Sequence, residues 1–470
     1  MKKFGFILSA CAALTLSAQT LAPQQHAEGR GVALLTLDSC KRLALQNNIA
    51  IRQAKHNISA AGQQRKETFT KYFPTVSATG VWFNANKGMA KMDINPSEMI
   101  SPELGASLAQ LFPPQMLASM SEPMSMTMMK RGTIASLTAV QPVFAGGQIV
   151  NGNKLAKVGE DVSKLQLQLS ENEVEKTVEG YFWQLASLQE KMKTVQAVEA
   201  LLSDIHKDVD VAVKAGVAMR NDLLQVQLRQ NDTESQKLTL QNNIGLLKSL
   251  LGQYMGLRPV AGADGASAYL FDVAVPDAAE PVPVLPTRVG EEQAVASLPE
   301  YQLLDKQVEA ARLQRKMAVG KNLPSLAVGA GYNYHNLLEN DRSFGMVFAT
   351  VSIPISDWWG GSHAIRRKKI EQMNAQEQQA NQTEMLKIRM QQTWNNVGES
   401  YQQLLIAQRS IDQAAENLRL NRDYYRAGTS RMSDLLEAQL LYQQALDRRV
   451  DAVADYHNKL LAYRQAVGER

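Results

Sequence analysis

Apolar residues recur at helical spacing in two long parts of the chain. Between Leu155 and Leu169 they are separated by steps of three and four, and the same steps recur between Leu446 and Leu460. Narrow apolar seams on otherwise polar helices are typical of coiled-coil packing. Both seams fall in long stretches without proline, 143–258 and 355–470. Because proline costs about 3 kcal/mol inside a helix, these stretches predict long helices.

One glycine interrupts the helical pattern in each stretch, Gly216 in the first and Gly428 in the second. Glycine after a helical run commonly ends a helix, and the Asn, Asp and Ser residues that follow are suited to starting another. The sequence therefore predicts two helical hairpins, over residues 148–256 and 361–468. If helical throughout, the first arm of the first hairpin, Gln148 to Val213, would extend roughly 100 Å at 1.5 Å per residue, so we expect an elongated molecule.

The two hairpins belong to a tandem repeat. One constant shift along the chain superposes Gly216 on Gly428 and Asp222 on Asp434, whereas a larger shift superposes Pro74 on Pro324 upstream. The change of shift places an insertion in the first copy, after Pro74. We expect one unit, repeated over 30–258 and 291–470 and joined by a linker over 259–290.

Alternation with a period of two predicts two strands in each copy, in β-hairpins over 73–142 and 323–356. In the clearest strand, apolar and aromatic residues from Leu326 to Tyr334 share one face, and small or polar residues from Ser325 to Asn333 share the other. A soluble edge hairpin and a tilted membrane strand both fit this pattern. Four strands cannot close a membrane barrel alone, so the membrane interpretation requires oligomerisation, and three chains would supply twelve strands.

The amino terminus favours export. Lys2 and Lys3 precede an apolar stretch that ends near Ala18, which predicts a signal peptide over residues 1–18. Alternatively, Leu8–Cys11 has the form of a lipoprotein cleavage box, which would leave Cys11 lipidated. No later apolar run approaches the roughly 20 residues of a membrane helix. The only other cysteine is Cys40, which excludes a disulfide scaffold.

Composition excludes several classes of function. A net charge of +4 is too small for a nucleic-acid-binding face. The six histidines lack metal-ligand spacing, and neither a nucleophile–base signature nor a nucleotide-binding loop occurs. We therefore expect no enzyme, no cofactor and no bound metal, with one alternative in the insertion. The segment of roughly Asn84 to Lys130 carries nine methionines, which could be apolar filler or could bind Cu(I) in an extracellular loop.

The mature chain resembles the TolC family of outer-membrane efflux channels over essentially its whole length. The elements that carry the resemblance, partly in tandem, are Leu37–Asn48, Phe73-Pro74, Gln141–Gly147, Leu323-Pro324 and Tyr425–Gln439. The resemblance implies a mainly helical protein with β-hairpins. It implies a homotrimer whose 12-stranded outer-membrane β-barrel continues into a periplasmic α-helical barrel.

The resemblance also implies functional residues at the two glycine turns. A periplasmic adaptor would dock at the tips formed by Ala215, Gly216, Val217, Ala427, Gly428 and Thr429, although each glycine could serve only as a turn former. Asp434 and Glu437 are three residues apart and share a helix face. In a trimer they would form carboxylate rings at a periplasmic gate, attracting cations and raising some carboxyl pKa values.

Contacts between Asp222 and Tyr425 would contribute to closing this gate. The family's arginine two residues after the second turn glycine is Ser430 here, with Arg431 one place later. The simpler alternative is that Asp434 caps its helix and Glu437 solvates it.

These observations predict a passive outer-membrane exit duct of a tripartite efflux pump or type I secretion system. Its partners would be outer-membrane lipid, a periplasmic adaptor and an inner-membrane transporter that supplies the energy. The cargo would be drugs or other small molecules, with proteins or metals as alternatives. Two other classes of protein remain open at this point: a periplasmic coiled-coil adaptor without membrane strands, and an extracellular adhesin.

Overall fold

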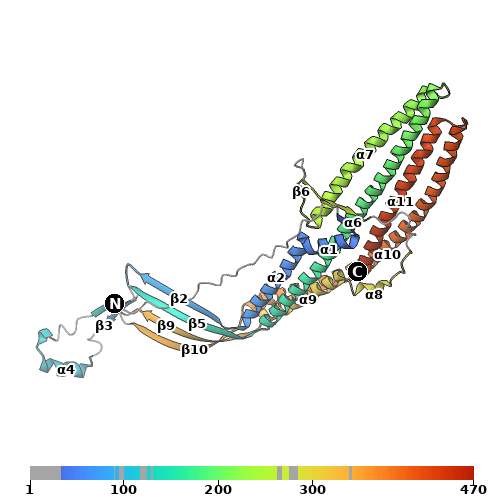
Figure 1. Cartoon of the computed structure of the whole chain (residues 1–470). Coiled ribbons are helices and arrows are strands. Elements are labelled where there is room, and N and C mark those ends of the chain that lie inside the picture. Colours follow the sequence, from blue (N-terminus) through green and yellow to red (C-terminus); the bar gives the residue numbers. More distant parts are fainter. Residues whose placement is uncertain are drawn as a thin grey trace.

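The computed structural model describes residues 33–88, 90–94, 100–116, 124–128, 131–261, 267–274, 284–337 and 341–469. The molecule is elongated (Figure 1). A β-sheet follows one end of the long helices, and two turns between helices lie at their other end. It is mainly helical with a sheet, as the sequence predicted. The expected signal peptide, 1–18, and Cys11 lie outside the described residues.

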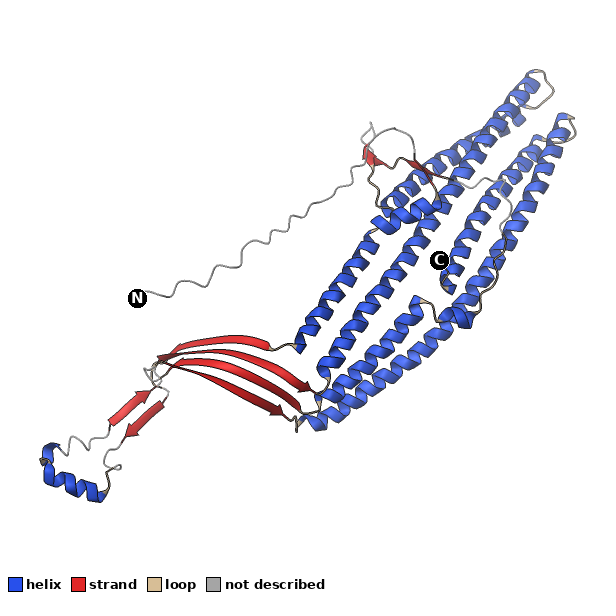
Figure 2. Ribbon diagram, turned by 60° about the horizontal axis from the view of Figure 1, so that its bottom comes forward, coloured by secondary structure: helices blue, strands red, loops and turns tan. Residues whose placement is uncertain are grey.

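Two very long helices run through most of the molecule. Four shorter helices pack along them, two on the half near the sheet and two on the distal half (Figure 2). The long helices are α6 (Gln148–Lys214) and α10 (Asp357–Arg426); the shorter ones are α2 (Ile49–Phe69) and α9 (Pro299–Lys321) near the sheet and α7 (Arg220–Tyr254) and α11 (Met432–Val467) distally. The distal pairs are the two helical hairpins. None of the described helices is both long and apolar enough to cross a membrane.

The proline-free amino-terminal stretch holds two helices rather than one. Helix α1 (Leu37–Asn47) ends at Asn48, whose side chain accepts a hydrogen bond from the Ala50 N–H at 2.8 Å and so caps α2. The same side chain donates to the carbonyl oxygen of Tyr254 at the end of α7, at 3.0 Å. Asn48 therefore lies at the break between α1 and α2 and also connects this break to the end of α7.

The β-hairpins of the two repeats form one four-stranded antiparallel sheet in the order β10-β9-β5-β2. The strands are β2 (Thr75–Asn84), β5 (Arg131–Ala145), β9 (Ser325–Asn336) and β10 (Arg342–Ser352). Pro142 lies within β5, where a register shift between Pro142 and Phe144 accommodates it. Strands β2 and β10 are the edges of the sheet, so each carries a row of backbone groups without a partner strand.

The two faces of the sheet differ in composition, although Val81 and Ile134, on the same face as Ser136, are apolar and exposed. On one face Ser136 lies between Thr79, its hydrogen-bond partner at 2.7 Å, and Asn333. The apolar face carries exposed side chains from all four strands: Val76, Trp82, Leu137, Val328, Tyr332, Val347 and Val351. An exposed apolar face this extensive is typical of a surface that meets lipid or another chain.

Strand β10 corrects the expected pattern on the polar face. Phe344, Met346 and Phe348 lie there, opposite Asn333, Gly331 and Gly329. The ring of Phe348 fills the space that a Cβ at Gly329 would occupy. Gly329, which looked like part of a small, polar surface, thus makes room for an aromatic side chain.

The insertion in the first repeat extends beyond the sheet (Figure 1). Its described parts are a two-stranded ribbon, β3 (Ala90–Ile94) with β4 (Met124–Met128), and the helix α4 (Pro102–Leu111). Helix α4 was not predicted from the sequence, and Ser101 caps it by accepting a hydrogen bond from the Leu104 N–H at 3.4 Å.

The expected linker, 259–290, holds secondary structure of its own. It contains β6 (Val260–Ala261), β7 (Ser267–Ala268) and β8 (Phe271–Val273), and α8 (Glu291–Val295) follows. Strand β8 pairs in parallel with β1 (Ala33–Leu35). This pairing joins the start of the first repeat to the chain that follows its end.

The core is divided into three clusters rather than concentrated in one. One lies among α1, α6, the end of α7 and β8, and includes Phe182 and Leu185. A second lies among α8, α10 and α11 around Tyr456, and the third lies near the distal turns. The first two clusters surround the middle of the molecule, where the helical layers and the linker meet.

His457 lies between the first two clusters, as expected for a packed residue in the apolar seam. Its ring stacks on that of Trp183 with centroids 4.0 Å apart and planes 8° apart, and it meets Tyr456 edge-on. Burial lowers the pKa of His457 to about 4, and the positive charge of Arg464 contributes to the lowering. The imidazole is therefore packed in its neutral form.

We expect this packing to make stability depend on pH. An unfolded chain binds a proton at His457 below about pH 6.5, whereas the folded chain does so only near pH 4. The free energy of unfolding should therefore decrease by up to about 3 kcal/mol per chain as the pH is lowered from 6.5 to 4. Thermal unfolding followed by helical circular dichroism should show this loss for the wild type. His457→Phe, which keeps the stacked ring, should lose less stability over the same interval; an unaltered pH profile would contradict the assignment.

A close approach between the two repeats lies at the base of the sheet. Gly146, with φ of 58°, precedes α6, and a Cβ there would overlap the carbonyl group of Gly320 in α9. Gly146→Ala should therefore lower the free energy of unfolding by at least about 2 kcal/mol, through both backbone strain and overlap. Gly159→Ala is the control, because Gly159 lies inside α6 with open space around it and should be neutral or stabilising by up to about 1 kcal/mol. Chemical denaturation of both variants would measure the difference.

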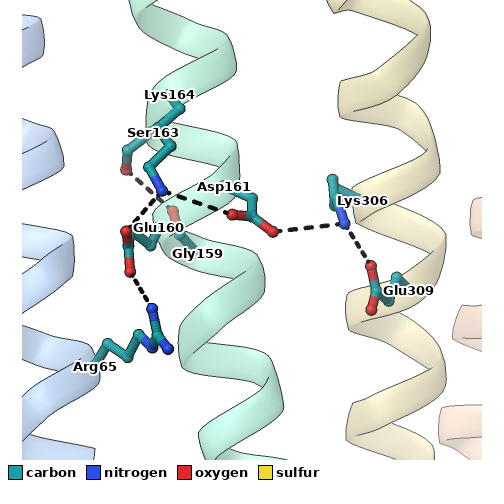
Figure 3. A network of polar contacts seen from close by, with 8 residues as sticks. All are labelled: Arg65, Gly159, Glu160, Asp161, Ser163, Lys164, Lys306 and Glu309. Carbon is teal, nitrogen blue, oxygen red and sulfur yellow. Dashed lines mark hydrogen bonds and ion pairs between the residues drawn. The ribbon is translucent and has the colours of Figure 1, made fainter.

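Charged residues tie three helices together several turns further along α6 (Figure 3). Glu160 of α6 pairs with Arg65 of α2 at 3.0 Å and with Lys164 at 2.7 Å, and the two cations hold the pKa of Glu160 below its usual range. Asp161 pairs with Lys306 of α9 at 3.6 Å. Adjacent residues of α6 thus contact α2 on one side and α9 on the other.

Candidate functional site at the helical tips

The two distal turns have the same backbone structure. Gly216 and Gly428 adopt φ values of 78° and 73° directly after α6 and α10. In each turn the glycine N–H and the next N–H donate back to the helix: Gly216 to Val213 and Val217 to Ala212, at 3.0 and 2.9 Å. Thr429 donates to Tyr424 in the same way at 2.9 Å. This is a Schellman motif, which requires the left-handed conformation that glycine adopts most easily.

All six residues predicted for docking lie at these turns and are exposed. Val217 has 80% of its surface accessible, and Met219, two residues further on, is 74% accessible. The structure thus presents a small apolar surface at the end of the molecule, on a rigid hydrogen-bonded turn.

The aspartates that follow each turn cap the returning helices. Asp222 accepts from the Met219 N–H at 3.3 Å, and Asp434 accepts from the Arg431 N–H at 3.2 Å. Asp434 also accepts from the hydroxyl groups of Ser430 and Ser433, at 3.1 and 3.2 Å. These hydrogen bonds lower the pKa of Asp434 within one chain, the backbone contribution being the largest.

Within one chain the hydrogen bonds to Asp434 favour its charged form. The raised carboxyl pKa values expected from a ring of carboxylates in a trimer stay a prediction. Ser430, which stands where the family can carry arginine, is one of the donors. Glu437 lies about one turn further along α11 and is exposed. Both carboxylates are thus exposed to solvent.

A groove of about 930 Å³ separates the two hairpins at the tips. It is lined by Asp222 from the first hairpin and Tyr425 from the second, together with Arg422 and Arg431. Burial and the negative charge of Asp222 both raise the pKa of Tyr425. Two of the four predicted gate residues are therefore brought together across the hairpins, whereas Asp434 and Glu437 lie outside the lining of this groove.

Sequence reasoning missed a polar network deeper between the same hairpins. Arg229 of α7 donates to Gln439 and Gln443 of α11 at 3.3 and 3.1 Å, and Gln443 donates to Gln236 at 3.1 Å. Gln439 and Gln443 are buried, at 1% and 4% accessible. The abundance of glutamine was visible in the sequence, but the partners of these glutamines lie in the other repeat, far away along the chain.

Within the described part of the chain, no group of three His, Cys, Asp or Glu side chains could hold a metal ion. In the insertion, backbone register pairs Met92 with Met126. Met89, Met99, Met120 and Met129 lie outside the described residues. Whether this segment is apolar filler or a Cu(I) site stays a prediction.

Comparison with known proteins points to one group. Residues 292–469 match the family model of the outer membrane efflux protein, which spans most of the second repeat. No curated protein matches the chain in sequence. The fold is similar to that of the outer-membrane channel OprN, with a TM-score of 0.73, 14% identity, and 92% of this chain and 90% of that chain covered.

Two further structures show the same likeness. CusC, described in terms of transmembrane channel formation, gives a TM-score of 0.74 at 13% identity and covers 92% of both chains. The open-state MtrE outer membrane channel of Neisseria gonorrhoeae gives 0.68 at 14% identity, with 92% of this chain and 89% of that chain covered. At these identities the likeness establishes the fold, including that of the first repeat, which the family model does not reach.

Proposed function

Because the chain belongs to the TolC-like outer-membrane efflux protein family, we propose that it is the outer-membrane exit duct of a tripartite pump. Three copies would assemble into a 12-stranded barrel that continues as a helical tube through the periplasm. The duct is passive and has no catalytic role; an inner-membrane transporter would supply energy and cargo, and a periplasmic adaptor would connect the two.

The observation that supports this proposal best is the four-stranded sheet with two open edges. One face is apolar and exposed over all four strands, while the other combines Ser, Thr and Asn side chains with the apolar residues of β10. A sheet in lipid cannot leave edges unpaired, so β2 of one chain must meet β10 of the next. Three chains would then give twelve strands with the apolar face towards lipid.

The geometry of the tips supports a role for them in docking and gating. The exposed turns around Gly216 and Gly428 would contact the adaptor. Asp434 and Glu437 would form carboxylate rings around the axis, and Asp222 with Tyr425 would couple the two hairpins. Opening would separate these hairpins at the groove that both residues line.

The deciding experiment is extraction and mass measurement of the native protein. We expect release from membranes only in detergent, a native mass of three mature chains, and ion conductance after insertion into planar bilayers. The alternative, a periplasmic adaptor without membrane strands, would be released by osmotic shock as a protein that does not insert into bilayers.

A further inference from the structure

A cationic groove lies where the helices meet the sheet, at the opposite end of the helical region from the tips. It runs between α2 and α6 and has a volume of about 640 Å³. Its lining combines the basic residues Arg65, Lys66, Lys154 and Lys157 with apolar side chains from Phe69, Tyr72 and Val150. The one carboxylate in the lining is that of Glu160.

Most of the positive charge in this groove is uncompensated. Glu160 is already paired with Arg65 at 3.0 Å and with Lys164 at 2.7 Å. Lys66, Lys154 and Lys157 are exposed, and none of the three forms an ion pair with a described residue. Asn153 donates to the Thr68 carbonyl at 3.2 Å and so holds the two walls together. The groove is therefore a fixed structure with three free ammonium groups.

Exposed aromatic residues mark this level of the molecule as a membrane boundary. Phe69 is 53% accessible and packs against Tyr72 and Phe73, with ring centroids 5.4 and 5.7 Å apart. Aromatic side chains beside lysines, at the point where spanning segments end, are typical of the interface between lipid and water. The strand β2 begins shortly after Phe73, at Thr75.

The same charges recur in the second repeat. The two shifts that define the tandem repeat superpose Arg65 on Arg315, Lys66 on Lys316, Lys154 on Arg366 and Lys157 on Lys369. Valine replaces Phe69 there, but Trp358 and Trp359 supply aromatic surface, and Trp358 donates to the carbonyl of Asn322 at 3.0 Å. All four basic positions are retained although the two repeats differ widely elsewhere.

The opposite side of the same helix pair has a different character. A second groove between α2 and α6 is lined mainly by uncharged polar residues, among them Gln53, Asn57 and Gln166. Helical periodicity of about 100° per residue places its α6 residues on the side away from Lys154 and Lys157. Uncharged polar groups suit the water-filled conduit of the proposed tube, an arrangement that would leave the cationic groove on the outer surface of the tube.

We propose that this groove binds the phosphate headgroup of an anionic phospholipid in the leaflet facing the periplasm. The ammonium groups of Lys66, Lys154 and Lys157 contact the phosphate, and Phe69 and Val150 contact the first part of an acyl chain. The inference rests on the proposed barrel, which sets this level at the membrane surface. Repetition in the second half would give six such sites around a trimer.

The test is native mass spectrometry of the full-length trimer titrated with phosphatidylglycerol, with phosphatidylcholine as the neutral lipid. We expect preferential retention of phosphatidylglycerol, weakened by roughly tenfold or more in the triple variant Lys66→Gln, Lys154→Gln, Lys157→Gln. The matched control is Lys193→Gln, Lys207→Gln, Lys237→Gln, which removes the same charge from lysines that pair with carboxylates far from the sheet. Millimolar inorganic phosphate should not displace the lipid, because it lacks the acyl chain.

Three results would overturn the proposal. Equal retention by the triple variant and its control would show that the groove does not hold the headgroup, while the trimer and its conductance would still stand. Displacement by inorganic phosphate would assign the site to a free anion. A changed ion selectivity in bilayers of neutral lipid, with retention unchanged, would place the lysines in the conduit. If the wild type did not form trimers at all, the proposed function itself would fail.

Discussion

Val347→Arg should abolish assembly of the protein in the outer membrane. Val347 lies at the middle of the edge strand β10, on the apolar face of the sheet, and is 86% accessible in one chain. In the proposed barrel its side chain meets lipid near the midplane, where arginine costs about 2–4 kcal/mol. A trimer would carry that cost three times. Cell fractionation and gel electrophoresis without heating should show loss of the trimer band.

The matched control is Met346→Arg, one residue away on the polar face. Its side chain lies opposite Gly331, towards the interior of the proposed barrel, where arginine remains in water. This variant should assemble normally and change only the conductance. Equal assembly of the two variants, or loss of both, would contradict the assignment of faces.

Neutralising the carboxylates at the tips should reduce the cation preference of the channel. The double variant Asp434→Asn with Glu437→Gln removes six negative charges from a trimer. Asparagine can still accept from the Arg431 N–H, so the start of α11 should stay intact. Because one pair of unit charges about 4 Å apart is worth about 1 kcal/mol in water, we expect the permeability ratio of K⁺ to Cl⁻ to fall roughly twofold to fivefold. Reversal potentials in asymmetric KCl would measure it.

A control for this variant removes the same charge from residues that lie away from the start of α11. Glu199→Gln with Asp204→Asn neutralises two carboxylates that pair with Lys237 and Lys207. That variant should keep the wild-type reversal potential. If both double variants behaved alike, or if neutralising Asp434 and Glu437 changed nothing, those two residues would not form the constriction.

Elements that depend on interactions between residues close together in the chain could be predicted from the sequence. Helix α6 covers Gln148–Lys214 because proline is absent and apolar residues step by three and four, and it ends where Gly216 supplies a left-handed residue. The strand β9 follows the alternation that begins at Ser325. These features depend on neighbours a few residues apart, which periodicity and turn chemistry report directly.

Features that depend on contacts between residues far apart in the chain could not be predicted from the sequence. Asn48, at the break between α1 and α2, bonds to Tyr254 of α7. Strand β1 pairs with β8, which lies beyond the end of the first repeat. The network of Arg229 with Gln439 and Gln443 joins the two repeats in the same way. At the tips, the sequence placed Asp434 on the correct turn, but only the structure shows that Ser430 and Ser433 bond to its carboxylate.

The two open edges of the sheet have a genetic corollary. A subunit damaged on β10 but sound on β2 could still join two normal copies, and the ring it entered would fail to close. With equal expression of both forms and random mixing, about one ring in eight would contain only sound subunits. Such an allele would therefore be dominant, and a plasmid carrying it would depress transport in cells whose chromosomal gene is intact.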